Sequence, residues 1–201
     1  MARTGRIPQV AGLLLAAGGG RRLGGRPKAL LEHHGRPLVE HAVEALRDGG
    51  CGPLHVVLGA AAADVLARAD LRGCVVGVNP AWETGLGSSL RAGIGALAGS
   101  GADAALVLLV DQPGIGAEAV ARVRSAYRSR TTLAAAAYAG ERGHPVLIGA
   151  DRWAEVAAGA VGDRGARAYL RARRDALALV ECSDVAEAFD VDTAQDLGRL
   201  A

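Results

Sequence analysis

The stretch VAGLLLAAGGGRRLGGRPKAL, residues 10–30, decides the fold and carries the first candidate site. Val10 and the apolar run 13–17 predict a short strand that is buried on both faces of a parallel sheet. The three glycines that follow, Gly18, Gly19 and Gly20, let the backbone pass close to a ligand. Such a turn can point several amide N–H groups at one anion.

Three cations follow the glycine turn: Arg21, Arg22 and Lys28. Together with backbone amides, they favour a phosphate chain over a neutral ligand. The stretch is not a P-loop, because Lys28 lies between Pro27 and Ala29 instead of between glycine and a serine or threonine. It also departs from the G-x-G-x-x-G dinucleotide pattern, and the next apolar run, LHVVLGA, ends without the acidic residue that would hold a ribose. A dinucleotide site therefore stays open as an alternative.

Length and composition limit the class of protein. With 201 residues, the chain can bury the core of one domain, and two domains would be small. A net charge of +2, the difference between 23 basic and 21 acidic residues, indicates neither a nucleic-acid coat nor a membrane-surface protein. Cys51, Cys74 and Cys182 lack metal or redox spacing, which indicates reduced thiols in a cytoplasm.

Arg3 and Arg6, followed by VAGLLLAAG, resemble the start of a secretory signal peptide. The apolar run is at the short end for such a peptide, and Arg21 and Arg22 follow where the mature protein would begin. No apolar run approaches the ~20 residues that cross a bilayer. We therefore expect a cytoplasmic protein with neither a nucleic-acid nor a membrane partner.

Strands and helices alternate along the chain. The expected strands after the first are Leu54–Leu58, Cys74–Val78, 104–110, 132–138, 145–148 and 176–180. Three expected helices have both ends: they run from Leu38 to a stop at Gly49, over 61–69 and over 117–129. Three more are expected from their starts: one capped by Ser88 or Ser89 that runs to Ala98, one capped by Asp163, and a last one after Thr193. This alternation predicts one α/β domain over residues 1–201, with a mostly parallel, three-layer sheet of the Rossmann-like type and ligands at the carboxyl ends of its strands.

One pattern in the first stretch is specific: Leu15, Ala16, Ala17, Gly18, Gly20, Arg22, Gly24 and Lys28. It resembles the loop of the MobA-like nucleotidyltransferases, which join a nucleoside triphosphate to a phosphorylated acceptor and release pyrophosphate. The resemblance implies that the loop residues bind the nucleotide: Leu15, Ala16, Ala17, Gly18, Gly19, Gly20 and Arg21. It also implies that Lys28 and Arg22 neutralise the charge that develops as pyrophosphate leaves. Many cytidylyltransferases of the family have only two residues between the last glycine and the lysine, whereas Gly25, Arg26 and Pro27 intervene here.

Two carboxylates match the family's metal positions. Asp111 ends the apolar run 104–110, beside the glycine turn if the strands pair, where a Mg²⁺ ion bridging triphosphate oxygens needs a hard oxygen ligand. The alternation of Asp190 and Asp192 predicts that both lie on one face of a strand. The resemblance implies that Asp111 binds nucleotide and metal and that Asp192 is the second metal ligand. From the residues alone, Asp111 is a turn residue or a ligand, and Thr193 caps a helix.

The later motifs resemble the cytidylyltransferase branch of the family. Asn79 and Ser88, in NPAWETGLGSSL, imply a loop that covers the nucleotide, with an ordinary loop and helix cap as the alternative. His144 before Pro145, and then Asp163 and Arg167 in GDRGAR, imply contacts with the acceptor. A turn histidine and a capped basic surface helix are the alternatives.

The resemblance runs from Leu15 to Leu197. It implies transfer of CMP from CTP to a molybdopterin-type molybdenum cofactor, with Mg²⁺ as cofactor and a molybdenum hydroxylase as a further partner. The acceptor phosphate is already ionised, so alignment and electrostatics would carry the reaction. Four alternatives stay open: GTP as donor, another phosphorylated acceptor, an NAD(P)-dependent oxidoreductase, and a nucleotide-binding accessory protein without turnover.

Overall fold

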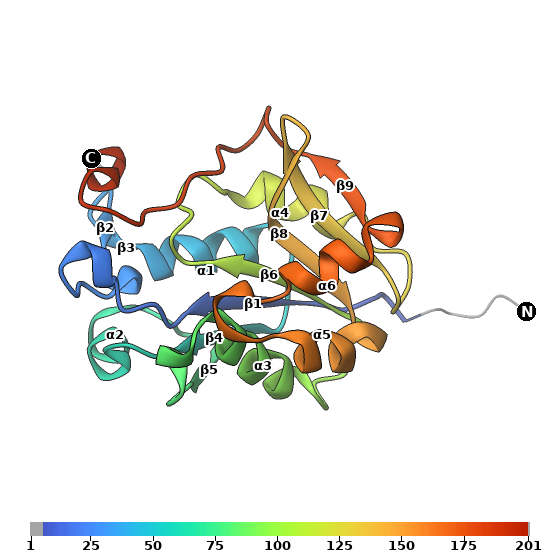
Figure 1. Ribbon diagram of the computed structural model, residues 1–201, viewed down its shortest axis with the longest axis horizontal. Coiled ribbons are helices and arrows are strands. Elements are labelled where there is room, and N and C mark those ends of the chain that lie inside the picture. The colour runs from blue at the N-terminus through green and yellow to red at the C-terminus, as the bar shows by residue number, and fades with distance from the viewer. Residues whose placement is uncertain (1–5, 201) are drawn as a thin grey trace, which may run out of the picture.

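The computed structural model describes residues 6–200, so Arg3 of the signal-peptide comparison lies outside the described residues. Seven strands form one sheet in the order β5-β4-β1-β6-β8-β7-β9 (Figure 1). They are β1 Val10–Ala16, β4 Leu54–Leu58, β5 Cys74–Val78, β6 Ala104–Leu109, β7 Leu133–Tyr138, β8 Glu141–Gly149 and β9 Ala178–Glu181. The helices are α1 Leu38–Asp48, α2 Ala62–Arg68, α3 Leu86–Leu97, α4 Ala117–Arg124, α5 Trp153–Gly159 and α6 Arg167–Ala172. A separate hairpin pairs β2 Glu32–His33 with β3 Arg36–Pro37.

Strand β1 is at the centre of the parallel part of the sheet. It pairs in parallel with β4 on one side and with β6 on the other, where Leu15 lies opposite Leu109. β8 is antiparallel to both β6 and β7, and β9 is parallel to β7. The predicted mostly parallel α/β sheet is confirmed, with the β7–β8 hairpin as its antiparallel part.

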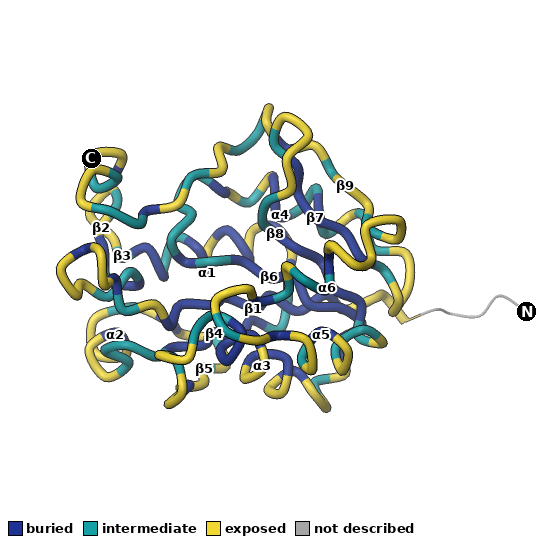
Figure 2. Tube along the Cα trace, in the orientation of Figure 1, coloured by how far each residue is buried: buried dark blue, intermediate teal, exposed yellow. Residues whose placement is uncertain are grey.

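Alternate residues of β1 enter two separate apolar cores, which makes the fold three-layered. Leu14 packs in the core beneath α1 and α4, whereas Leu13 and Leu15 pack in the core beneath α3, α5 and α6. All seven β1 residues are buried, as the dark tube at the middle of Figure 2 shows. Successive strand residues point to opposite faces, so a continuous apolar run is what a strand covered on both faces requires.

Two expected helix starts are wrong. Helix α3 begins at Leu86, with Gly85 as its N-cap at a φ of 107°, and neither Ser88 nor Ser89 caps it. The Ser88 hydroxyl donates instead to the carbonyls of Ala81 and Gly85. Asp163 lies in a short 3-10 helix, Gly162–Arg164, which is separated from α6 by a left-handed Gly165.

Other element boundaries also differ from expectation. Helix α4 ends at Arg124 instead of residue 129, because the Ser125 hydroxyl bonds back to the Arg122 carbonyl and the chain turns through Ala126 and Tyr127. The segment with Asp190 and Asp192 is not a strand. Helix α5 and the β2–β3 hairpin were not expected from the sequence.

The order of the strands fixes where a ligand can bind. After β1 the chain continues to β4 on one side of it, and it later returns to β6 on the other side. The loops that follow β1 and β6 therefore run in opposite directions and leave a crevice at the carboxyl ends of these two strands. The C-terminal segment crosses from β9 to the β2–β3 hairpin, where the C-terminus lies (Figure 1). There the Leu200 carbonyl lies 3.0 Å from His33 Nδ1. Among the described residues, we find no helix with the length and apolar character to traverse a bilayer.

Candidate functional site

The glycine-rich loop folds back on itself after β1. Gly20 adopts a left-handed conformation with a φ of 59°, and its carbonyl accepts a hydrogen bond from Gly25 N–H at 3.0 Å. Gly24 and Gly25 are also left-handed, so the chain reverses within the residues that follow the loop. The Lys28 N–H then donates to the Gly18 carbonyl at 3.3 Å. The longer spacing before the lysine is therefore accommodated, and Lys28 returns to the start of the loop.

Lys28 lies between the two carboxylates that the sequence proposed as metal ligands. Its Nζ donates to Asp111 Oδ2 at 2.6 Å and also to Asp192 Oδ1. The exposed side-chain fractions are 13% for Lys28, 18% for Asp111 and 33% for Asp192. Arg22 Nη2 donates to the other oxygen of Asp192 at 3.0 Å. Four residues from three distant parts of the chain thus meet at the carboxyl ends of β1 and β6.

Backbone hydrogen bonds hold Asp192 in this position. The Val191 N–H donates to the Asp111 carbonyl at 2.8 Å, and the Val191 side chain is fully buried. The Asp196 carboxylate accepts from the N–H groups of Asp192 at 3.1 Å and of Thr193 at 2.7 Å. Because β6 and the C-terminal segment are joined in this way, Asp111 and Asp192 face the same space.

The three charged groups perturb one another. Burial would lower the pKa of Lys28, but Asp111 and Asp192 outweigh burial and raise it. Burial raises the pKa of Asp111 in spite of the adjacent Lys28 ammonium. The hydrogen bond from Lys28 lowers the pKa of Asp192. The ionised form of Asp111 therefore depends on a neighbouring cation more than the ionised form of Asp192 does.

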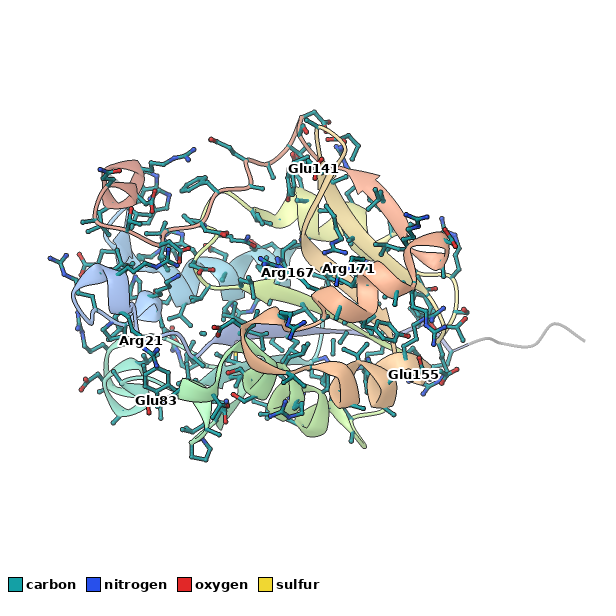
Figure 3. The ribbon with its side chains drawn as sticks, viewed as in Figure 1. Arg21, Glu83, Glu141, Glu155, Arg167 and Arg171 are labelled. Carbon is teal, nitrogen blue, oxygen red and sulfur yellow. The ribbon has the colours of Figure 1, made fainter. Side chains whose placement is uncertain are left out.

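A first cleft of about 460 Å³ opens over the loop. Most of the predicted site residues line it: Leu15, Ala17, Gly18, Gly19, Gly20, Arg21, Arg22, Lys28, Asp111, Asp163, Arg167 and Asp192. Figure 3 labels Arg21, from the glycine-rich loop, and Arg167, from α6, which lie at different parts of this cleft. Ala16, Asn79, Ser88 and His144 do not line it.

Asn79 and Ser88 are buried behind the wall of the first cleft. The Asn79 side-chain amide donates to the hydroxyls of Ser88 at 2.8 Å and Ser89 at 3.1 Å. Its carbonyl oxygen accepts from the Ala81 N–H at 3.0 Å. These bonds fix the turn between β5 and α3, so both residues shape the cleft wall. Only Ser89 of this group lines the cleft.

A second cleft of about 270 Å³ adjoins the first, and His144 lines it. The two clefts share Leu15, Leu86, Leu109, Arg167 and Asp190. Burial lowers the pKa of His144 to about 4, so its imidazole is neutral near pH 7. Gln112 Nε2 donates to Asp190 Oδ1 at 2.7 Å at the boundary of the two clefts.

The sequence reasoning missed Trp82, which lines the first cleft and covers the glycine-rich loop. A Cβ atom at Gly19 would lie 2.8 Å from the Trp82 ring, so only glycine fits beneath the indole. Trp82 lies within the stretch NPAWETGLGSSL, in a chain with only 3% aromatic residues. An aromatic residue in that position was the available signal.

The donor set fits a divalent cation that is shared with a ligand. In the part of the chain that the structure describes, no group of three or more His, Cys, Asp or Glu side chains is placed to hold a metal. Mg²⁺ is commonly held by one or two carboxylates together with substrate phosphates and water. Asp111 and Asp192 meet that requirement, with Lys28 now between them.

A glycine-rich loop and an acidic pair at the switch point of a parallel sheet are typical of α/β proteins that bind nucleotides. The sequence model of the MobA-like NTP transferase domain matches residues 12–177, and the chain belongs to this family. Asp190 and Asp192 lie beyond the matched residues.

The chain is also similar to individual known proteins. The chain is 43% identical to the nicotine blue oxidoreductase of Paenarthrobacter nicotinovorans, over 96% of this chain and 97% of that protein. It is 29% identical to the molybdenum cofactor guanylyltransferase of Shewanella amazonensis, over 70% of this chain and 68% of that protein. Among solved structures, the Mycobacterium tuberculosis protein Rv0371c in complex with manganese is 27% identical over 96% of this chain and 97% of that chain, with a TM-score of 0.79.

Proposed function

We propose that this nucleotidyltransferase-family chain, acting as a single domain, transfers CMP from CTP to the terminal phosphate of a molybdopterin-type molybdenum cofactor and releases pyrophosphate. The observation that carries the proposal is the Lys28 ammonium held between Asp111 and Asp192 beside the glycine-rich loop. A cation trapped by two carboxylates marks the place where a divalent metal and a polyphosphate can replace it.

The bound nucleotide would change the partners of Lys28. In the free protein, the ammonium forms ion pairs with both Asp111 and Asp192. With a triphosphate on the loop, Lys28 and Arg22 turn to the phosphate oxygens and stabilise the charge of the departing pyrophosphate. Mg²⁺ held by Asp111 and Asp192 would supply Lewis-acid polarisation of the phosphates. The manganese complex of Rv0371c supports a divalent metal in this fold.

The remaining predicted residues take supporting roles in the proposal. The loop from Leu15 to Arg21 binds the triphosphate through its backbone amides and the arginine. Asn79 and Ser88 act through the cleft wall that they fix. Arg167, which lines both clefts, lies where donor and acceptor would meet, with Asp163 on the donor side and His144 on the acceptor side.

A second candidate function is oxidoreduction with NAD(P)H. One observation favours it, the name of the 43% identical relative, which is an oxidoreductase. Against it stands the acidic pair around Lys28, because binding of a dinucleotide needs no pair of metal carboxylates. GTP as the donor is favoured by the name of the guanylyltransferase relative.

A turnover assay separates the candidates. The protein is incubated with Mg²⁺, molybdopterin and either CTP or GTP, and pyrophosphate release is measured; NADPH consumption is followed at its absorbance band in parallel. The proposal expects pyrophosphate from CTP at least tenfold faster than from GTP, and no NADPH consumption. Faster pyrophosphate release from GTP would indicate a guanylyltransferase. NADPH consumption without pyrophosphate release would indicate an oxidoreductase and contradict the proposed transfer reaction. Delivery of the product to a molybdenum hydroxylase in the cytoplasm is part of the same proposal.

A further inference from the structure

Strand β5 forms one edge of the seven-stranded sheet, on the side away from β7 and β9 (Figure 1). Its sequence is CVVGV, and it pairs with β4 without a shift in register. Edge strands usually carry a charge, a proline or a bulge that keeps further strands from pairing. The other edge strand, β9, has four residues and ends in Glu181. Strand β5 has none of these protections, so its outer edge is able to pair with another strand.

The outer edge of β5 presents the backbone groups of alternate residues. Just after the strand, the Asn79 N–H donates to a β4 carbonyl at 2.8 Å. Because the direction of the backbone groups alternates along a strand, the N–H and carbonyl groups of Val76 and Val78 point away from β4. The Cys74 carbonyl points the same way, whereas the Cys74 N–H donates to the Leu71 carbonyl at 3.1 Å. A further strand would find donors and acceptors in a row.

The side chains of β5 leave apolar surface in contact with water. Val75 is 53% exposed and Val78 is 54% exposed, although both are in the sheet. A Cβ atom at Gly77 would meet no atom within 4 Å, so space is open beside this glycine. Covering the two valines would remove apolar surface from water, which favours association.

The edge of β5 is complementary to a second copy of itself. Antiparallel pairing about a two-fold axis at Val76, the middle residue of the strand, places Val75 of each copy opposite Gly77 of the other. The glycine then leaves room for the valine on the same face of the sheet. The same pairing brings each Val78 N–H to the Cys74 carbonyl of the other copy. A two-fold contact of this kind needs only one surface, which both copies carry.

The charges at the two ends of β5 also suit antiparallel pairing. Arg68 and Arg72 precede the strand and are exposed, and Arg72 pairs with Asp70 at 2.5 Å. Glu83 follows the strand and is exposed. Within residues 6–200, neither Arg68 nor Glu83 forms an ion pair inside the chain. Antiparallel pairing places the end with the excess positive charge of one copy against the end with Glu83 of the other, which favours this orientation.

We propose that two copies of this chain associate through antiparallel pairing of β5, with the two-fold axis at Val76, so that one sheet runs through both copies. The carboxyl ends of the two β5 strands then point in opposite directions, and the first clefts open at opposite sides of the dimer. A contact centred on a strand of five residues is short compared with the ~1,600 Å² of a standard stable interface. The dimer should therefore dissociate on dilution.

Sedimentation velocity over a series of protein concentrations tests the association. The wild type should pass from the mass of one chain to that of two as the concentration rises. Val75→Lys should weaken dimerisation by about tenfold or more, because the pairing would bury two unpaired charges. Leu179→Lys is the matched control, since Leu179 is 52% exposed on the opposite edge strand, β9, and it should leave dimerisation unchanged. Thermal unfolding checks that both variants fold. A wild type that stays monomeric, which would leave the edge to a strand of another protein, or equal weakening in both variants would overturn the proposal.

Cross-linking tests the register of the pairing. In a Cys74→Ser background, Val75→Cys and Gly77→Cys together place two thiols opposite each other across the dimer axis. Opposite residues at such non-hydrogen-bonded positions have Cα atoms about 4.5 Å apart, within the range of a disulfide. A mild oxidant should link the two chains of this variant, as a non-reducing gel shows, and should link the variant with Val75→Cys alone far less. Equal linking in the two variants, or none in the first, would contradict the two-fold axis at Val76.

Discussion

Lys28 Nζ lies 2.6 Å from Asp111 Oδ2, although 83 positions separate the two residues in the chain. The contact joins the loop after β1 to the end of β6, and Asp192 closes it from the C-terminal segment. The Lys28 side chain therefore occupies the place where the proposed function puts a cation shared with a phosphate chain.

Replacing Lys28 should have opposite effects on metal binding and on turnover. In Lys28→Met, the two carboxylates are free of their ammonium, so Mn²⁺ should bind the nucleotide-free protein more tightly than it binds the wild type. Nucleotidyl transfer should fall on the order of 10²–10³-fold, since a cation facing the leaving group is lost. Electron paramagnetic resonance of free Mn²⁺ measures the first effect. Unchanged Mn²⁺ affinity would mean that Lys28 and the metal do not compete.

Asp196 should control the position of Asp192. Asp196→Ala removes the acceptor of two backbone N–H groups and of the Thr193 hydroxyl. We expect a loss of about 1 kcal/mol in the free energy of unfolding and a weaker Mn²⁺ affinity. Thr193→Val is the matched control, because it removes only the hydroxyl and should leave Mn²⁺ binding nearly unchanged. Equal Mn²⁺ binding in both variants would refute this role.

Gly19 and Gly20 should fail on substitution for different reasons. A Cβ at Gly19 would meet the Trp82 ring at 2.8 Å, whereas a Cβ at Gly20 would lie 1.9 Å from the Arg26 carbonyl oxygen at a φ of 59°. Gly19→Ala should lower the free energy of unfolding by about 1–3 kcal/mol. Trp82→Leu should rescue Gly19→Ala in part and should not rescue Gly20→Ala, as chemical denaturation can show. Additive effects in the Gly19 and Trp82 pair would contradict the contact.

His144 should make stability depend on pH. Its pKa is lowered from 6.5 to about 4, so the unfolded chain binds a proton in the window between these values and the folded protein does not. Stability contributed by the neutral ring is present above pH 6.5 and is lost as the pH falls toward 4. At the acid end, the loss should reach at most about 3 kcal/mol. Urea denaturation at a series of pH values should show a smaller loss in the free energy of unfolding for His144→Asn than for the wild type. Equal losses in the two proteins would mean that the pKa of His144 is close to its ordinary value.

Much of the fold could be predicted from local pattern. β4 and β5 have the predicted boundaries, because short apolar runs between turn residues leave one choice for a strand. Helix starts were less predictable: α3 begins where Gly85 reaches a positive φ, and the nearby serines bond to carbonyls instead of capping. Propensity alone does not reveal such competition between hydrogen bonds.

The site was predictable where it lies at strand ends. Parallel pairing of β1 with β6 brings Asp111 to the glycine-rich loop, as the sequence indicated. The route of Asp192 to the same point depends on long-range backbone bonds of an irregular segment, which no periodicity encodes. The packing of Trp82 on Gly19 is likewise a tertiary contact without a local pattern.

Calorimetric binding of CTP in the presence and absence of Mg²⁺, for the wild type and Asp111→Ala, tests the central claim most directly. The account predicts Mg²⁺-dependent binding of CTP in preference to GTP and ATP, and its loss in the variant. Binding of NAD(P)H without binding of any triphosphate, or CTP binding that Asp111→Ala leaves intact, would contradict it.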